Sequence, residues 1–172
     1  KAENDLIEAI SKAEESEIIE TKTFLGFEFG MTDQEVNNYL LKLKKEGKIY
    51  INSRNSFQYD FYLSGMEIYL NFVPEYYEGK LYKITYPANT KLGVKDVHIF
   101  LLSAFRGTKD DFKTRINNDI LGDTYYTNIK DNMIITFRDS RMIYENAPIS
   151  KLAKQKEEEI RKEKSNKSNS EF

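Results

Sequence analysis

The clearest pattern of hydrophobic and polar positions is a period of two that runs from residue 57 to residue 72. With Ser64 and Gly65 as a two-residue hairpin loop, apolar and aromatic side chains meet across two strands. The predicted pairs are Leu63–Met66, Phe61–Ile68, Tyr59–Leu70 and Phe57–Phe72. The opposite face collects Gln58, Asp60, Tyr62, Glu67, Tyr69 and Asn71. The alternation therefore predicts an antiparallel sheet with one buried face and one open face.

The same alternation constrains the next connection, near residues 77–79. A three-residue loop there sets Phe72 opposite Ile84 and keeps the buried face continuous, whereas a two-residue loop would turn Ile84 toward water. We therefore expect the three-residue loop, with Gly79 in the left-handed conformation. The residues expected on the buried face are Phe61, Ile68, Leu70, Phe72 and Ile84, with Leu70 opposite Tyr86.

Helical periodicity marks the segments around these strands. A capping box of Thr32 and Glu35 begins a helix at residues 33–46, and Gly47 ends it. Apolar positions at helical spacing also predict a weak amphipathic helix or a leader in residues 3–20. The remaining helices are predicted from residue 94, over residues 109–120 and over residues 150–164, the last followed by a polar tail.

Further strands are predicted at residues 24–29, 48–51, 124–129 and 133–138 and after a turn at residues 139–140, with Phe137 opposite Met142 and Ile135 opposite Tyr144. The expected fold class is α+β, with antiparallel β-meanders and helices packed on one face. The order of a helix followed by a meander occurs twice, in residues 22–88 and 93–147. We interpret these as two tandem sub-repeats of one α+β domain (22–148), flanked by an N-terminal leader or helix (1–21) and a charged helix with a polar tail (149–172).

Composition narrows the function classes. The chain of 172 residues has a formal net charge of -2, which gives no overall positive field for nucleic acid. Cysteine is absent, which excludes thiolate catalysis and disulfides, and no apolar run has the length of a membrane span. The chain starts at Lys1 with a Lys-, Glu- and Ser-rich segment, which suits an exported protein without its signal peptide or a shortened chain.

Candidate chemistry is sparse. His98 is the only histidine, and no acid or nucleophile is placed beside it by spacing. Asp60 and Glu67 are diagonal neighbours on the open face, where carboxylates commonly serve solubility and no cleft shifts their pKa values. The Asp- and Asn-rich turns lack the spacing of a calcium loop. We therefore expect a protein that is not an enzyme and has no catalytic residue, metal or cofactor.

Tyrosines suggest a binding surface. Asp60, Tyr62, Glu67 and Tyr69 share the open face, and exposed tyrosine is enriched at protein interfaces. The alternative is that a terminal helix covers these rings. The tyrosines at predicted turns and strand edges are a second candidate set, formed by Tyr76, Tyr77, Tyr125 and Tyr126.

The motif Gly30-Met31-Thr32-x-x-Glu35-Val36-x-x-x-Leu40, followed by a meander and a second helix plus meander, resembles small exported bacterial lipoproteins with the tandem architecture of β-lactamase inhibitor proteins. The chain departs from the accessory lipoproteins at Gly47-Lys48-Ile49, where they have Gly-x-Pro, and it lacks the disulfides of the inhibitors. The resemblance implies a noncatalytic protein-binding module of the bacterial cell envelope. The expected location is periplasmic or outer-membrane-anchored, with a lipid anchor on the precursor as one form and the cytoplasm left open as an alternative.

Two other classes remain open. The first is a small-molecule carrier or hydrolase with a pocket between helix and sheet, which a deep apolar cavity ringed by polar groups would favour. The second is a winged-helix-like nucleic-acid binder that uses residues 42–48, and the charge balance does not support it. The expected partner is thus another protein, with no nucleic acid and no membrane span.

Overall fold

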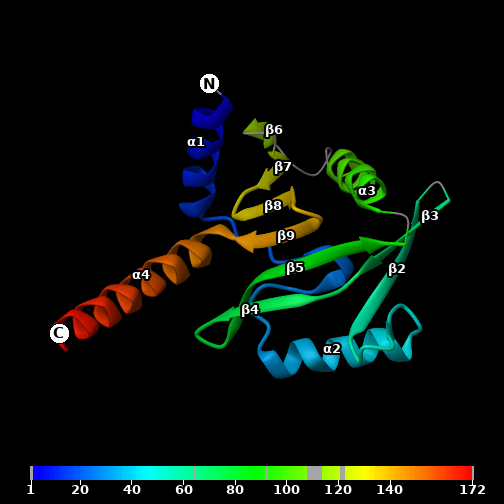
Figure 1. Cartoon of the computed structure of the whole chain (residues 1–172), viewed down its shortest axis with the longest axis horizontal. Helices are drawn as coiled ribbons and strands as arrows, with labels where there is room; N and C mark the ends of the chain where they lie inside the picture. The colour runs from blue at the N-terminus through cyan, green and yellow to red at the C-terminus, as the bar shows by residue number, and fades with distance from the viewer. Residues whose placement is uncertain (1, 64, 92, 108–113, 121–122, 172) are drawn as a thin grey trace.

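The computed structural model describes residues 2–63, 65–91, 93–107, 114–120 and 123–171 (Figure 1). Its helices are α1 (Ala2–Glu14), the 3-10 helix η1 (Phe24–Gly26), α2 (Asp33–Lys45), α3 (Val94–Gly107) and α4 (Ala147–Ser170). Its strands are β1 (Tyr50–Ile51), β2 (Phe57–Leu63), β3 (Met66–Leu70), β4 (Val73–Tyr77), β5 (Lys80–Thr90), β6 (Thr114–Ile120), β7 (Asp123–Lys130), β8 (Met133–Arg138) and β9 (Arg141–Asn146). The chain is an α+β protein with an antiparallel sheet, as its hydrophobic pattern predicts.

The described strands form one sheet in the order β1-β2-β3-β5-β9-β8-β7-β6, with β4 also paired to β5. The long strand β5 joins the two halves of the sheet. Its C-terminal residues pair with β3, and its earlier residues pair with β4 on one side and with β9 on the other. In Figure 1 the β2–β3 hairpin extends away from the part of the sheet formed by β7, β8 and β9.

The inner face of the sheet carries the main core. α2 contributes Val36, Leu40 and Leu43, and α3 contributes Val97, Phe100, Leu101 and Phe105. Beneath these helices lie fully or nearly fully buried side chains from both halves of the sheet, among them Ile68, Leu70, Ile84, Tyr86, Ile135 and Phe137. The single core explains why residues far apart in the sequence share one buried face.

The outer face of the sheet is covered only over the second half. α1 contacts β6, β7, β8 and α4, and Ala13 packs there with Ile129, Ile134 and Ala147 in a second, smaller cluster. Figure 1 shows α1 beside these strands, at the opposite end of the sheet from the β2–β3 hairpin. The segment assigned in the sequence as a helix or a leader is thus a helix, and it packs on the face opposite α2 and α3.

Asn132 anchors the segment that follows α1. Its side-chain oxygen accepts a hydrogen bond from the Glu20 amide, and its Nδ2 donates to the Glu20 carbonyl at 2.9 Å and to Asn146 Oδ1 at 2.8 Å. Asn132 is fully buried, so these bonds satisfy a side chain that would otherwise be costly to bury.

Several local predictions are confirmed. The hairpin pairs Leu63 with Met66, Phe61 with Ile68 and Tyr59 with Leu70, and the later hairpin pairs Phe137 with Met142 and Ile135 with Tyr144. The capping box of Thr32 and Glu35 begins α2. Gly47 follows with a positive φ, and the amide of Lys48 donates to the Leu43 carbonyl, which closes the helix end.

The predicted three-residue loop at residues 77–79 is wrong. The loop has two residues, Glu78 and Gly79, both with positive φ, and the pairing then shifts between Glu75 and Tyr76 through a bulge. Leu70 therefore lies opposite Ala88, and Pro74 lies opposite Ile84. Because the bulge restores the parity that a two-residue loop would have lost, Ile68, Leu70 and Ile84 are still fully buried.

The predicted pair Phe57–Phe72 does not form. Pairing of β2 with β3 runs only from Leu63–Met66 to Tyr59–Leu70, and Phe57 lies opposite Ile51 of β1. The Asn71 side chain instead donates to the Phe57 carbonyl at 3.0 Å. Phe72 and Phe61 are partly buried against the core, as the predicted buried face requires.

Three segments differ from their predicted secondary structure. The expected strand at 24–29 contains η1, because Leu25 and Gly26 have positive φ and leave the extended conformation. Within the expected helix at 109–120, residues 108–113 lie outside the described residues and 114–120 form β6. A spacing of four places Ile116 and Ile120 on one side of either a helix or a strand, so the pattern was ambiguous. The polar tail after residue 164 is helical, since α4 continues to Ser170.

Candidate functional site

The predicted binding residues lie together on the uncovered part of the outer face. Asp60 is opposite Tyr69 and Tyr62 is opposite Glu67 in the β2–β3 hairpin, and Tyr50 of β1 is opposite Gln58. We call this surface the open face and define it by these side chains, which are Tyr50, Gln58, Asp60, Tyr62, Glu67 and Tyr69. Its backbone positions follow from strand alternation, which turns each of them away from the core beneath α2 and α3.

Hydrogen bonds hold Asp60 and Tyr50 in place. The Tyr50 hydroxyl donates to Asp60 Oδ1 at 3.1 Å, and Gln58 Nε2 donates to the same oxygen at 2.9 Å. Partial loss of hydration and the hydrogen bond to Asp60 raise the pKa of Tyr50. Asp60 thus accepts bonds from two neighbours and fixes the orientation of the Tyr50 ring.

Tyr62 is the most exposed aromatic side chain of the open face, at 69% of its full accessibility. Its hydroxyl donates to Glu67 Oε1 at 3.3 Å. The negative charge of Glu67 raises the pKa of Tyr62, with smaller contributions from lost hydration and from this hydrogen bond. Tyr62 therefore presents a large aromatic surface to solvent while its polar end is already oriented.

Tyr69 lies between the carboxylates of the open face and the basic side chain of Lys91. The Lys91 ammonium lies 6.0 Å from the centre of the Tyr69 ring, within the range of a cation–π interaction. A hydrogen bond to Tyr69 raises the pKa of Lys91. Tyr69 and Lys91 also line a broad cleft of about 660 Å³ across β1, β2, β3 and the end of β5. Its other lining residues include Arg54, Asn71, Asn89 and Thr90.

The two carboxylates of the open face have different partners. Asp60 and Glu67 are each bonded to a different tyrosine hydroxyl, so they do not form a carboxylate pair. No three His, Asp or Glu side chains among the described residues could together hold a metal ion. What the arrangement offers is a polar and aromatic surface with fixed hydrogen-bonding groups.

His98 lies elsewhere, on α3. It shares a small cavity of about 160 Å³ with Asp139 and Ser140. Asp139 is engaged by Arg138 and Arg141 at 3.5 Å, and within the described residues His98 makes no hydrogen bond to either cavity neighbour. These three residues therefore do not have the mutual geometry of a catalytic triad.

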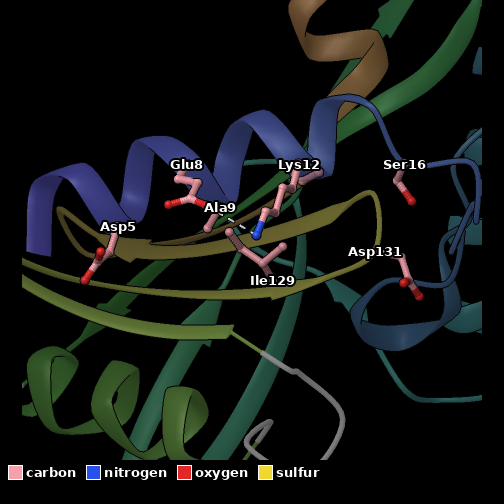
Figure 2. Close-up of a pocket in the computed structure, with 8 residues that line it drawn as sticks. Asp5, Glu8, Ala9, Lys12, Ser16, Ile129 and Asp131 are labelled. Atoms are coloured by element: carbon pink, nitrogen blue, oxygen red, sulfur yellow. Dashed lines mark ion pairs between the residues drawn. The ribbon is translucent and has the colours of Figure 1, made fainter.

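A groove between α1 and β7 is the third polar hollow, shown in Figure 2. Asp5, Glu8, Lys12 and Asp131 line a volume of about 460 Å³, and Lys12 pairs with Glu8 at 3.4 Å. In Figure 2 the carboxylates of Asp5 and Asp131 stand at opposite ends of the groove. Because these acids do not converge, the groove has no recognisable ligand-binding arrangement.

An apolar cavity of about 280 Å³ lies between α3 and the inner face of the sheet. Its lining in the described part of the chain is formed by Phe24, Phe61, Phe100, Ser103, Ala104, Gly107, Met142 and Tyr144. It lies between a helix and the sheet, the place expected for the pocket of the alternative function class. Its apolar lining contains no ring of converging polar groups.

Comparisons of the chain with protein-family models, with curated proteins and with solved structures each found no match. None of the helices in the described residues combines the length and the apolarity needed to cross a bilayer.

The sequence alternation placed five of the six open-face residues on this face, four of them as binding candidates, and it did not place Tyr50. Tyr50 belongs to it because β1 pairs with β2, a pairing that the short polar turn after a predicted strand suggests. Lys91, beside the open face, was not predicted, because it follows the end of β5 at Thr90 and comes near Tyr69 only through the pairing of β5 with β3. Of the second tyrosine set, Tyr126 is buried against Phe105 and Tyr77 lies 5.6 Å from the Lys156 ammonium, while the side chain of Tyr125 is outside the described residues.

Proposed function

We propose that this protein is a noncatalytic binding module that recognises another protein through the open face. The observation that carries the proposal is the unequal cover of the outer sheet face. α1 buries Ile129 and Ile134 over the second half, whereas Tyr62 of the first half is 69% exposed. An uncovered sheet face that carries rigid aromatic rings is typical of an interface.

The order of the open face supports this proposal energetically. Tyr50, Gln58 and Asp60 are joined by hydrogen bonds, and Tyr62 is bonded to Glu67. Because these side chains are already ordered, binding at this surface costs less side-chain entropy than binding at a surface of freely rotating side chains. Tyrosine also provides a large contact area for few rotatable bonds, which suits central interface anchors.

The proposed location is the bacterial cell envelope, on the strength of the motif at residues 30–40 and the order of a helix followed by a meander. Fractionation of cells that produce the full precursor tests this part separately. Recovery with the periplasm or the outer membrane is the expected result, and recovery only in the cytosol would contradict the location without affecting the open face.

The binding proposal is tested by affinity capture from an envelope extract with the wild type and with the double variant Tyr62→Ala/Tyr69→Ala. Truncation of a central tyrosine anchor costs about 2 kcal/mol or more at an interface. We expect the double variant to lose a specific partner that the wild type captures. Thermal melts must first show that the two proteins have similar stability.

A matched control removes exposed apolar surface elsewhere. Leu152 and Ile160 of α4 are 44% and 43% exposed and lie outside the open face. Leu152→Ala/Ile160→Ala should retain the partner. Loss of the partner in both double variants, or in neither, would contradict recognition by the open face.

A second candidate function is a small-molecule carrier, and the apolar cavity under α3 favours it. The cavity of about 280 Å³ offers no nucleophile paired with a base in its described lining, so it favours a carrier over a hydrolase. Carrier activity at this cavity and protein recognition at the open face use different residues and are tested independently.

A further inference from the structure

The cavity between α3 and the sheet is large for a protein interior. Cores are close-packed, with few voids that exceed one water molecule. An engineered apolar cavity of about 150 Å³ binds benzene. The cavity under α3 measures about 280 Å³, which is enough for a two-ring molecule or for one ring with a short chain.

Water is a poor occupant of this cavity. Five of its lining residues are Phe24, Phe61, Phe100, Ala104 and Met142, whose side chains offer no strong hydrogen bonds. A buried water needs about two to four polar partners. Among the described lining side chains, only the hydroxyls of Ser103 and Tyr144 can serve as such partners. Ser103 is exposed, so the cavity reaches the surface at this point of α3.

Tyr144 supplies an independent observation. Its side chain is only 6% exposed, and its hydroxyl has no hydrogen-bond partner within the described part of the chain. Burial also raises the pKa of Tyr144, so the hydroxyl keeps its proton. The hydroxyl atom itself is not fully buried, so it faces the open volume of the cavity, where an acceptor on a ligand can reach it.

Tyr86 provides the comparison within the same core. Its ring meets the Tyr144 ring at a centroid distance of 5.8 Å, and its side chain is 0% exposed. The Tyr86 hydroxyl, however, donates to the Phe24 carbonyl at 2.6 Å and lies 3.2 Å from Thr23 Oγ1. The Tyr86 hydroxyl is therefore bonded within the core, whereas the Tyr144 hydroxyl lies at the wall of the cavity.

We propose that the cavity under α3 binds a small, uncharged, mostly apolar molecule that carries one hydrogen-bond acceptor, and that Tyr144 donates to this acceptor. An uncharged ligand matches the described lining, which contains apolar side chains, Gly107 and the hydroxyls of Ser103 and Tyr144. The aromatic rings of Phe24, Phe61 and Phe100 supply the apolar contacts. This inference rests on the carrier candidate and is independent of the open face.

Three probes with the same ring system test the ligand class. Naphthol has one hydroxyl, naphthalene has none, and naphthalenesulfonate carries a charge. We expect saturable binding of one naphthol per chain, weaker binding of naphthalene and no binding of the sulfonate in calorimetric or fluorescence titrations. Non-saturable uptake of naphthol, or preferential binding of the sulfonate, would overturn the proposal.

Two variants locate the binding. Tyr144→Phe removes only the hydroxyl, so naphthol affinity should fall by about tenfold, the effect of one hydrogen bond of about 1.4 kcal/mol. Naphthalene affinity should not change. Ala104→Leu fills the cavity from α3 and should abolish binding of both probes, whereas Lys95→Leu adds the same side chain at an exposed position of α3 and should bind both like the wild type.

Circular dichroism shows whether Ala104→Leu is folded. If it is not, the Tyr144→Phe affinity ratio and the Met142 methyl resonance decide the question, because Met142 lines the cavity. Equal naphthol affinity for Tyr144→Phe and wild type, or a Met142 resonance that naphthol does not shift, would overturn the site. Tyr62→Ala/Tyr69→Ala should bind naphthol normally, so failure of the cavity and failure of the open face are distinguishable.

Discussion

The two halves of the outer sheet face differ although they belong to one continuous sheet. Over β7 and β8 the face is covered by α1, and Ile129 and Ile134 are 5% and 6% exposed. Over β2 and β3 it is open, and Tyr62 is 69% exposed. The inner face shows no such difference, since α2 and α3 contribute to one core that contains residues of both halves.

Cross-strand pairs explain the difference. Ile129 lies opposite Ile134 in the covered half, a pair that is stable only if another element removes it from water. In the open half Tyr62 lies opposite Glu67. This pair of a polar aromatic and a charged side chain is stable in contact with water and can also contact a partner protein. The residue types in directly opposed pairs thus distinguish the half of the outer face that packs against α1 from the half that is open to a partner.

The largest expected effect tests whether the inner face is equivalent in both halves. Leu70→Ala and Ile135→Ala should each lower the free energy of unfolding by about 2 to 5 kcal/mol, because both residues are at most 1% exposed. Chemical denaturation measures the two values. A neutral result for Leu70→Ala alone would show that the core does not extend under the open half.

The next effect separates the two halves of the outer face. Ile134→Ala should destabilise the protein by about 2 to 4 kcal/mol, because it removes contacts beneath α1. Tyr69→Ala should cost less than about 1 kcal/mol, because Tyr69 lies on the open face and is only partly buried. Similar losses for the two variants in denaturation curves would contradict the proposed difference.

A third effect concerns how α1 is kept in place. Asn132→Ala removes the partner of both backbone groups of Glu20 and should cost about 1 to 3 kcal/mol. The amides of α1 should then exchange with solvent faster than those of α2 in hydrogen-exchange measurements. Unchanged protection of the α1 amides would show that Asn132 does not hold α1 on the outer face of the sheet.

The next prediction concerns the loop between β4 and β5, which precedes the strand that joins the two halves of the sheet. Gly79 has φ +77 and no atom near the position of an added Cβ, so substitution strains only the backbone. Gly79→Val should lower stability by about 1 kcal/mol or more, and Gly79→Asn by less. Thermal melts that place the two variants together would contradict a left-handed requirement at Gly79.

The smallest effect on stability is expected from the charge of the open face. Glu67→Gln should change the free energy of unfolding by less than about 0.5 kcal/mol, as is typical of exposed sites. Because the Glu67 charge is the main cause of the raised pKa of Tyr62, the variant should lower that pKa. An NMR titration of the Tyr62 ring measures the shift, and an unchanged titration curve would show that Glu67 is not close to Tyr62 in solution.

Sequence periodicity predicted the β2–β3 hairpin correctly because its apolar pairs meet only in one register. It failed at the β4–β5 loop, where a two-residue loop plus a bulge gives the same buried face as a three-residue loop. Parity identifies a face but does not distinguish between two loops that conserve it. The strand β6 was predicted as helix because spacings of four fit both structures.

The candidate site was predictable in part for the same reason. Asp60, Tyr62, Glu67 and Tyr69 follow from a single local hairpin, whereas Lys91 reaches the site only through pairing of β3 with β5. The cavity under α3 depends on how residues from η1, β2, α3 and β9 pack together, which no local pattern describes. Tyr144 was predicted opposite Ile135, but the place of its hydroxyl at the cavity wall is a property of the packed structure.

Photo-crosslinking tests the central claim, that the open half of the outer face is the recognition surface, most directly. A photoreactive phenylalanine derivative replaces Tyr62 on the open face or Ile7, which is 60% exposed on α1 in the covered half. We predict one specific adduct in envelope extract from position 62, competed by unlabelled wild type, and none from position 7. Equal adducts from both positions, or a specific adduct only from position 7, would contradict the account.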